Sequence, residues 1–394
     1  MNLDEFQSFK QLDAQNMLAE IDGLPDQLQS AWELGQTSEV FKISEVSKVV
    51  IAGMGGSAIG ADLLSSYALR TCRVPVFVHR DYGLPAWARG PETLVIALSH
   101  SGNTEETLDS FDQALKNQCL IIAIATGGEL AARATKAKVP LWQFEHEGQP
   151  RAAVGFSFGL LLAIFTRLGL MLAHQTDGAA VPWPGQDGQL PPEHATIPSL
   201  WRAKGLIPDP SKELARAVAA MKRQQETLRA ETPVAQNPAK RMAGQLMGRW
   251  VNVFGSGLLA PVARRWKTQI NEIAKAGAGF EVLPEADHNT LAGLSNPEDV
   301  LSHTFTIFLR APSETTNSTH PRNRLRADLT RQTFMLEGLN TDFFDAQGDS
   351  PLAHVWTALH FGDYTAYYLA MAYGVNPTPV EALEKFKAAM KAAK

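Results

Sequence analysis

Short apolar runs recur between residues 48 and 144, and they constrain the fold more than any other feature of the sequence. They are rich in Val and Ile and apolar on both faces: KVVIAGM (48–54), VPVFVH (74–79), TLVIALS (93–99), CLIIAIA (119–125) and KVPLWQF (138–144). Helix-like segments such as ADLLSSYAL and TEETLDSFDQALKN lie between them. Strands buried on both faces are typical of a parallel sheet whose crossover helices cover both sides. We therefore predict a doubly wound α/β domain over residues 1–175.

The second half of the chain repeats this layout after a change in composition. Residues 176–210 are dense in Pro and Gly and lack periodicity, which predicts a connector. Helical periodicity returns at residue 211, and WVNVFGSG (250–257) then leads into a long amphipathic segment. Further strands are expected at GAGFEVLP (277–284), HTFTIFLR (303–310) and FMLEGLN (334–340). We predict a second α/β domain over 211–394 that ends in a helix, VEALEKFKAAMKAAK, which follows NPTP.

Composition excludes several classes of partner. The chain of 394 residues carries 36 basic and 41 acidic side chains, well interspersed, so it lacks the clustered positive charge that nucleic-acid binding needs. Its two cysteines, Cys72 and Cys119, cannot by themselves form a disulfide framework or a zinc site, and their apolar surroundings predict buried thiols. The polar N-terminus does not resemble a signal peptide, and the apolar run 156–173 contains Arg167, so it predicts a buried helix. We expect a cytoplasmic protein without nucleic-acid or membrane partners.

The stretch VVIAGMGGSAIG (49–60) places a glycine-rich turn between the first strand and the first helix. Gly53, Gly55 and Ala58 fit the G-x-G-x-x-G/A pattern of dinucleotide-binding turns. A dinucleotide site also needs an acidic residue at the end of the second strand, but Asp81 comes late, after a basic pair that includes Arg80. Since an arginine there suits a 2′-phosphate, this turn alone leaves a dehydrogenase, another anion site and a purely structural turn open.

The turn after the next strand favours a phosphate monoester. Ser99, Ser101 and Thr104 surround Gly102 where a helix is predicted to begin. Free backbone N–H groups and the positive end of the helix dipole meet at such a point, and the hydroxyls add donors. The alternative is that Ser101 or Thr104 only caps the helix, which needs a single hydroxyl.

Together these motifs carry a family resemblance. GMGGSA (53–58) with SHSGNTEETL (99–108) resembles a sugar isomerase (SIS) domain, and the wider pattern resembles the bifunctional phosphoglucose/phosphomannose isomerase family. Segments throughout the chain support it: PRAAVGFSFG (150–159), QNPAKRMAGQLMGRWVNVFGSG (236–257), KTQINEIAKAG (267–277), VLPEADHNTLAG (282–293) and FGDYTAYYLAMAYGVNPTPVEALEKFK (361–387). The resemblance implies two flavodoxin-like SIS subdomains with parallel sheets. It implies a cofactor-free and metal-free isomerase that interconverts fructose 6-phosphate with glucose 6-phosphate and mannose 6-phosphate through a cis-enediol(ate).

The resemblance also assigns residues. Its sugar-phosphate-binding set corresponds here to Gly55, Gly56, Ser57, Ser99, Ser101 and Thr104. Glu272 matches the base that moves a proton between C1 and C2. His288 matches the histidine of ring opening, which in related isomerases comes from a neighbouring subunit, so a homodimer with a shared active site is implied.

Two cations complete the implied site. Arg151 matches the family's arginine, which holds developing negative charge, and a surface arginine at a helix start is disfavoured by the helix dipole. A functional lysine near the C-terminus corresponds best to Lys387, with Lys385 as the alternative. Without the resemblance, Glu272 is interpreted as a solvated partner of Lys275.

Two departures from the family pattern leave alternatives open. The segment before His288, GAGFEVLPEADHN, is smaller than the bulky aromatic segment typical of the family, and the connector at 176–210 is longer. Either departure is compatible with isomerisation of another sugar phosphate, including an amino sugar. Either is also compatible with a non-catalytic protein that binds sugar phosphates.

Overall fold

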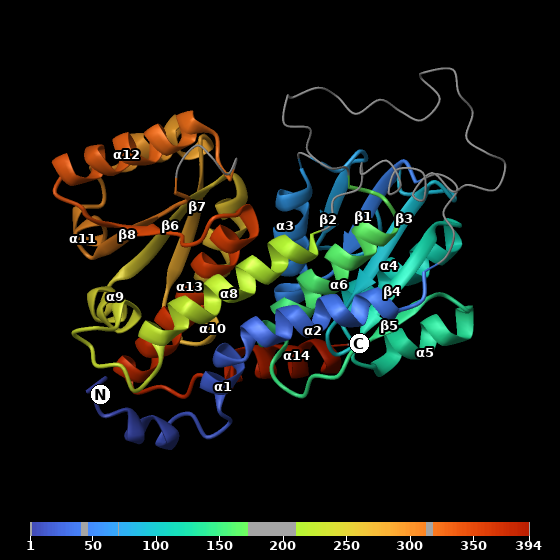
Figure 1. Ribbon diagram of the computed structural model, residues 1–394, viewed down its shortest axis with the longest axis horizontal. Helices are drawn as coiled ribbons and strands as arrows, with labels where there is room; N and C mark the ends of the chain where they lie inside the picture. Colours follow the sequence, from blue (N-terminus) through green and yellow to red (C-terminus); the bar gives the residue numbers. More distant parts are fainter. Residues whose placement is uncertain (1, 41–45, 70, 172–209, 313–317, 394) are drawn as a thin grey trace. The chain divides into compact units, whose positions relative to one another are not determined.

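The computed structural model describes residues 2–40, 46–69, 71–171, 210–312 and 318–393, and its chain divides into two compact units (Figure 1). The N-terminal unit is Leu24–Val218, and the C-terminal unit combines Met1–Gly23 with Ala219–Lys394. The predicted division differs from this one, because the first 23 residues join the C-terminal unit instead of the domain predicted over 1–175. The predicted connector lies outside the described residues as far as residue 209.

The N-terminal unit contains a parallel sheet of the predicted type. Its strand order is β2-β1-β3-β4-β5, and all its neighbours pair in parallel. Each strand coincides with one of the apolar runs: β1 Lys48–Ala52, β2 Val76–His79, β3 Thr93–Leu98, β4 Leu120–Ala125 and β5 Leu141–Gln143. The central strands β1, β3 and β4 are almost wholly buried, as expected for strands covered on both faces.

Helices cover both faces of this sheet. Helix α4 (Glu105–Lys116) and helix α5 (Gly128–Ala137) pack on one face, where Phe111 and Leu130 share a core with strand side chains. On the other face, Trp142 of β5 contacts Gly35 of helix α2 (Leu24–Thr37), and α2 packs on helix α6 (Val154–Arg167), which also contacts helix α3 (Gly55–Ala68). The predicted buried helix is confirmed in α6. Among the described residues, no helix has both the length and the apolar character needed to cross a bilayer.

The sheet of the C-terminal unit repeats the parallel arrangement with the order β7-β6-β8-β9. Its strands are β6 Trp250–Ser256, β7 Ala278–Leu283, β8 Thr304–Arg310 and β9 Asn340–Asp345. The strand predicted at 334–340 is wrong. Residues 334–336 end helix α12 (Pro321–Leu336), Gly338 turns the chain with a φ of 76°, and the strand begins at Asn340. The apolar FML run is instead a helix end, with Phe334 packed in the core against Phe254 and Phe308.

Helix α13 (Pro351–Tyr373) is the centre of the C-terminal unit. Every residue from Leu352 to Ala372 is buried, as expected for a helix surrounded by other elements. It packs against α9 (Pro238–Leu246), α10 (Ala260–Glu272) and α1 (Met17–Asp22). The remaining elements are η1 Phe6–Gln11, η2 Pro150–Ala152, α8 Ser211–Leu228, η3 Gly257–Leu259, η4 Glu285–His288, η5 Thr290–Gly293, α11 Glu298–Ser302 and the predicted C-terminal helix, α14 Glu381–Ala392.

Polar contacts attach the first 23 residues to α13. The hydroxyl of Tyr364 donates to Asp22, and that of Tyr367 donates to Asp13 over 3.1 Å. Burial and the neighbouring carboxylates raise the pKa of both tyrosines, so their hydroxyls remain donors. His360 bonds the carbonyl of Ile21 through Nε2 at 2.8 Å. The N-terminal segment is therefore a structural part of the C-terminal unit.

The two cysteines are less buried than predicted. Both Cys72 and Cys119 are half-buried free thiols. Desolvation nevertheless raises the pKa of each, which keeps them protonated near neutral pH.

Candidate functional site

The turn between β1 and α3 leaves a helix N-terminus open. Gly55 is the first residue of α3, has a φ of +51°, and a Cβ built on it would meet no atom within 4 Å. A glycine is favoured here because the left-handed region strains other residues. The N–H groups of Gly55 and Gly56 have no partner within the helix, as at any helix start, whereas that of Ser57 donates to the carbonyl of Met54 over 3.1 Å. Together with the buried Ser57, this open turn offers donors to an anion.

The hydroxyls after β3 do not act as helix caps. Thr104 occupies the N-cap position of α4, yet its side chain makes no capping hydrogen bond. Its Oγ1 instead lies 2.9 Å from Oγ of the buried Ser99. Oγ of Ser101 accepts a bond from the N–H of Asn103 over 3.2 Å. The capping interpretation is therefore wrong for Thr104 and Ser101, and α4 presents a second helix N-terminus surrounded by hydroxyls.

A close backbone approach fixes this second turn against α5. Gly102 has a φ of +68°, and a Cβ on it would lie 1.9 Å from the carbonyl oxygen of Gly127. A Cβ on Gly128 would lie 2.3 Å from the carbonyl oxygen of Ser101. The side chain of Asn103 spans the contact, since its amide donates to Ser101 O over 3.1 Å and its Oδ1 accepts from the N–H of Glu129 over 3.0 Å. A substituted glycine at either position would force the two loops apart.

Sequence reasoning did not identify these contributions from Asn103 and Gly128. A signal for Gly128 was available, because a Gly-Gly pair follows the apolar run of β4 just as glycines follow β1. No local pattern points to Asn103, since its partner Glu129 comes from the next strand-to-helix turn.

Arg151 lies directly beside the first turn. A Cβ on Gly56 would lie 2.5 Å from the carbonyl oxygen of Pro150 and 3.1 Å from Cα of Arg151, so only a glycine allows this approach. The Arg151 side chain is 4% exposed, which confirms that it is no surface arginine. Its Nη1 donates to Oε1 of Gln149 over 3.3 Å. A guanidinium held in such a dry place is suited to bind negative charge.

These segments gather at one edge of the N-terminal sheet. Strands β1 and β3 are hydrogen-bonded neighbours, so their carboxyl ends bring the turns at 53–57 and 99–104 side by side. Gly56 then joins the first turn to the segment of Arg151. The carboxyl edge of a parallel sheet, with two helix N-termini and a buried arginine, can bind a phosphate group.

Arg80, the residue that would suit a dinucleotide 2′-phosphate, points back to the protein. Its Nη2 pairs with the carboxylate of Asp62 in α3 and donates to the carbonyl of Ala58 over 3.1 Å. The guanidinium thus fastens the end of β2 to α3. Because Arg80 already pairs with Asp62, its position no longer supports binding of a dinucleotide 2′-phosphate.

Glu272 is the last residue of α10 and is half-buried. Helix α10 ends at Glu272, and Lys275 adopts a φ of +55° shortly after it. Nζ of Lys275 donates to the main-chain carbonyls of Glu272, at 2.5 Å, and of Pro377, at 3.2 Å. A cation at these carbonyls stabilises the helix end. Lys275 therefore bonds the main chain of Glu272.

A buried ion pair holds α10 in place. Arg265 donates through Nε and Nη2 to both oxygens of Asp363 in α13, over 3.1 and 2.8 Å. The indole of Trp266 donates to the carbonyl of Ala358 over 2.8 Å. Bidentate pairing of this kind fixes orientation as well as distance. The end of α10 that carries Glu272 is thus anchored about two turns upstream.

His288 closes the short helix η4 and is exposed. Its neighbour Asp287 anchors this segment to α12, accepting from Arg326 Nη1 over 2.8 Å and from Thr330 Oγ1 over 2.7 Å. An exposed imidazole next to an anchored residue is accessible to an external group.

Lys387 lies on α14, whose described residues are all exposed. The alternative, Lys385, is 3.7 Å from Glu381 in an i, i+4 ion pair on the same exposed helix. The choice between the two lysines stays a prediction.

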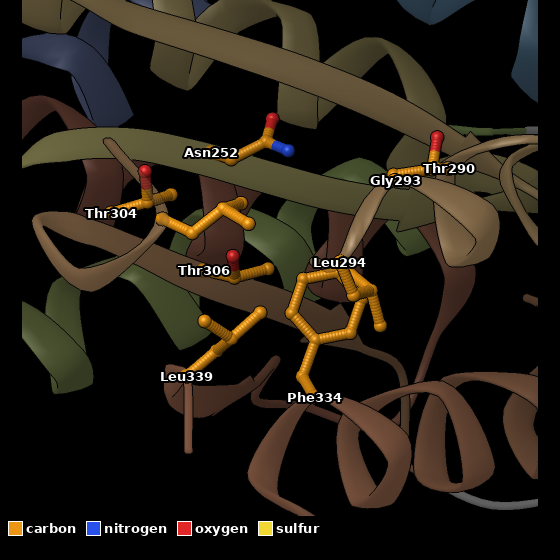
Figure 2. A pocket seen from close by; sticks show the side chains of 9 residues that line it. Asn252, Thr290, Gly293, Leu294, Thr304, Thr306, Phe334 and Leu339 are labelled. Carbon is orange, nitrogen blue, oxygen red and sulfur yellow. The ribbon is translucent and has the colours of Figure 1, made fainter. Parts of the chain in front are cut away.

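A small pocket lies beneath the segment that follows His288 (Figure 2). Asn252 of β6 and Thr306 of β8 are register partners, so their side chains share one face of the sheet there. Thr290 and Gly293 of η5 and Phe334 of α12 also line it. Its volume of about 80 Å³ is well below the roughly 300–1,000 Å³ of typical ligand pockets. This pocket is too small for a hexose phosphate.

The predicted site residues therefore fall into two sets. The structure brings together the residues of the two turns and Arg151, all in the N-terminal unit. Glu272, His288 and the two lysines belong to the C-terminal unit, and they are spread there over α10, η4 and α14.

Comparison with known proteins identifies the family. Residues 235–390 match the model of the bacterial phospho-glucose isomerase C-terminal SIS domain. The chain is 35% identical over 375 residues to a bifunctional phosphoglucose/phosphomannose isomerase of Caldicellulosiruptor bescii, covering 94% of this chain and 98% of that protein. A protein of the same name from Aquifex aeolicus is 29% identical, covering 87% of this chain and 90% of its own length.

Solved structures agree on the fold. A hypothetical protein from Thermus thermophilus superposes with a TM-score of 0.67 at 16% identity, over 96% of this chain and 90% of that one. Tagatose-6-phosphate ketose/aldose isomerase from Escherichia coli gives a TM-score of 0.62 at 14% identity, over 92% and 94%. The extent of the sequence match, together with the two SIS-type parallel sheets, establishes that this chain belongs to the bifunctional phosphoglucose/phosphomannose isomerase family.

Proposed function

We propose that this protein interconverts fructose 6-phosphate with glucose 6-phosphate and with mannose 6-phosphate. The observation that carries the proposal is the pair of helix N-termini at 53–57 and 99–104, where Thr104 bonds Ser99 instead of capping α4. Such an arrangement binds a terminal phosphate through backbone N–H groups and hydroxyls. The names of the relatives support glucose and mannose phosphates as substrates, and fructose 6-phosphate is the ketose that shares a C1–C2 enediol with both aldoses.

The chemistry needs a proton carried between C1 and C2 of the open-chain sugar. In this proposal the Glu272 carboxylate takes the proton from one carbon and returns it to the other, with a cis-enediol(ate) between the two steps. Arg151 stabilises the negative charge that develops on the enediolate oxygen, since a buried guanidinium is a fixed and permanent cation.

Cyclic sugars must open before this step. His288 transfers a proton at the ring oxygen, a task suited to imidazole near neutral pH. Lys387 serves as the second acid/base group of ring opening. Every step is a proton transfer, and the proposed chemistry therefore needs neither metal nor cofactor. We also propose that the enzyme is cytoplasmic.

We further propose a homodimer in which His288 completes the active site of the partner subunit. The exposed position of His288 and its anchoring to α12 through Asp287 support this arrangement. The outer side of α12 supports it as well, because Leu325, Leu329 and Leu336 are 43%, 52% and 80% exposed. An apolar row at this spacing on a soluble helix favours a partner surface.

Subunit mixing tests the shared site. Glu272→Gln and His288→Ala proteins, each inactive alone, are co-refolded and assayed with glucose 6-phosphate. Random pairing makes half of the molecules heterodimers, each with one intact site, so about a quarter of the wild-type activity should return. No recovery, with heterodimers verified by two affinity tags, would place His288 in its own subunit's site.

A second sugar-phosphate reaction is the main alternative. D-glucosamine-6-phosphate 4-epimerase from Sulfolobus acidocaldarius is 26% identical over 250 residues, covering 63% of this chain and 64% of that protein. A non-catalytic protein that binds sugar phosphates is the other alternative.

The decisive experiment is a coupled assay of purified protein with fructose, glucose and mannose 6-phosphates, with and without EDTA, run beside a separate assay with glucosamine 6-phosphate. The proposal expects turnover of all three sugars and no loss with EDTA. Turnover of glucosamine 6-phosphate alone would favour the epimerase alternative. Binding of fructose 6-phosphate without turnover would favour the non-catalytic one.

A further inference from the structure

Two histidines face each other beside the phosphate-binding turns. Nε2 of His100 and Nδ1 of His146 are 2.9 Å apart, and the rings are nearly perpendicular at 84°. Because one nitrogen must donate and the other accept, at least one ring is neutral in this bond. His100 follows β3 and His146 follows β5, so the bond joins loops from strands that are not neighbours in the sheet.

Aromatic side chains define where these rings lie. The Phe144 ring is 5.9 Å from His100, and the Phe156 ring is 5.9 Å from His146. Phe144 and Phe156 stack on each other with centroids 4.7 Å apart. Edge-to-face contacts of this kind restrict ring rotation. The hydrogen bond is therefore held at one geometry by its surroundings.

On one side, the pair is attached to the phosphate-binding hydroxyls. His100 stands between Ser99 and Ser101 in the chain. Its carbonyl accepts from Thr126 twice, from the N–H over 3.0 Å and from Oγ1 over 2.7 Å. With the carbonyl and the ring both fixed, the main chain of His100 has little freedom to rotate, and the positions of the two flanking hydroxyls follow from it.

On the other side, the pair is attached to the segment of Arg151. His146 lies three residues before Gln149, whose Oε1 accepts from Arg151 Nη1 over 3.3 Å. Pro150 and Arg151 in turn press against Gly56 of the first turn. The two histidines thus connect the hydroxyl turn to the arginine segment.

We propose that His146 is a positioning residue for sugar-phosphate binding, which acts through His100 to hold the Ser99–Thr104 turn and the Arg151 segment in register. This role rests on the proposed function. It predicts weaker binding of the phosphate group, with proton transfer at C1 and C2 unaffected, when the bond is removed.

The experiment replaces each histidine either by phenylalanine, which lacks the hydrogen-bonding nitrogen, or by an amide side chain, which retains a hydrogen-bonding atom near it. In His146→Phe and His100→Phe the aromatic packing stays and the bond is lost. In His146→Asn and His100→Gln an amide stands near the lost Nδ1 or Nε2. We expect each Phe variant to raise KM for fructose 6-phosphate, and Kd for inorganic phosphate, about 3- to 10-fold with kcat within twofold, as loss of one hydrogen bond implies. The amide variants should recover most of this loss.

His79→Phe is the matched control. His79 is another half-buried histidine of the same unit, at the end of β2, and its Nε2 makes no hydrogen bond to the described residues. Its KM should stay at the wild-type value. The double variant His100→Phe, His146→Phe should bind no more weakly than either single variant, because both remove the same bond.

Additive losses in the double variant would overturn the inference, as would an unchanged KM in His146→Phe. A fall in Tm shared by the Phe and amide variants, with KM following Tm, would show a purely structural role. Failure of the proposed function is a separate result, since the wild-type protein would then neither turn over nor bind fructose 6-phosphate.

Discussion

The two units place a similar turn at the same point of the same topology, but only one turn is open. After β1, Gly55 has a φ of +51° and its missing Cβ faces empty space. After β6, Gly257 has a φ of +54°, but a Cβ there would lie 3.0 Å from the carbonyl oxygen of Ser318 and 3.2 Å from Oγ1 of Thr319. The chain itself fills the second turn, where Leu258 N–H bonds Ser318 O over 3.3 Å.

Even a pair of hydroxyls recurs in both units. Ser99 and Thr104 are 2.9 Å apart in the N-terminal unit, and Ser256 and Thr319 are 3.1 Å apart in the C-terminal unit. The fold alone therefore does not make a phosphate site. What matters is whether another part of the chain already uses the donors at the start of the helix.

The largest expected effect concerns chemistry assigned to the C-terminal unit, whose turn is closed. Glu272→Gln should lower kcat about 10²- to 10⁴-fold, because the amide cannot carry a proton between C1 and C2. Binding of fructose 6-phosphate should stay within twofold, measured by calorimetry. Glu337→Gln, at the exposed residue that closes α12, is the control. Normal exchange of the C2 proton with solvent in the Glu272→Gln protein would refute the assignment.

The next effect separates the two hydroxyl pairs. Ser101→Ala with Thr104→Ala should raise KM about 100-fold with little change in kcat, the effect of losing two bonds to a charged phosphate at the lower value of roughly 1.5 kcal/mol each. Ser256→Ala with Thr319→Ala removes hydroxyls from the closed turn and should leave KM unchanged. Equal changes in the two double variants would mean that the comparison between the turns is wrong.

How far the sequence alone leads can be judged from these turns. The runs of Val and Ile predict most strands correctly, because a strand buried on both faces is recognised locally. Gly55, Ser101 and Thr104 each follow such a strand closely in the sequence, so their anion site at the carboxyl edge of the sheet is also predicted from local patterns. The strand at 340–345 is missed because FML before it is equally apolar yet ends a helix. Closure of the second turn by Ser318 depends on a residue about 60 positions away, which no local pattern encodes.

Glycine substitutions sharpen the comparison at the level of stability. Gly55→Ala should lower the free energy of unfolding by roughly 1–2 kcal/mol, the cost of a left-handed alanine, and should also raise KM. Gly257→Ala carries the same backbone strain plus the clash with Ser318 O, so its loss of stability should be larger while KM stays normal. Urea denaturation and steady-state kinetics of both variants measure this difference. The reverse order of stabilities would contradict the described packing.

The smallest expected effect concerns how the stability of the C-terminal unit changes as the pH falls. Burial lowers the pKa of His360 in the folded C-terminal unit below that of the unfolded chain. Below about pH 6.5, His360 therefore binds a proton in the unfolded chain more readily than in the folded unit. The free energy of unfolding then falls as the pH is lowered, by at most about 1.4 kcal/mol per pH unit. His360→Gln should reduce this dependence below about pH 6.5, measured by thermal unfolding. His303→Gln, at an exposed histidine of the same unit, is the matched control.

The attachment of Met1–Gly23 to the C-terminal unit has a consequence for biosynthesis. The N-terminal unit is a continuous insertion within a unit assembled from both ends of the chain. During translation, Asp13 and Asp22 leave the ribosome before the inserted unit, but their partners Tyr367 and Tyr364 are made only after it. The inserted unit can fold while the chain is still growing. The C-terminal unit, which carries Glu272, cannot complete its core until helix α13 has been synthesised.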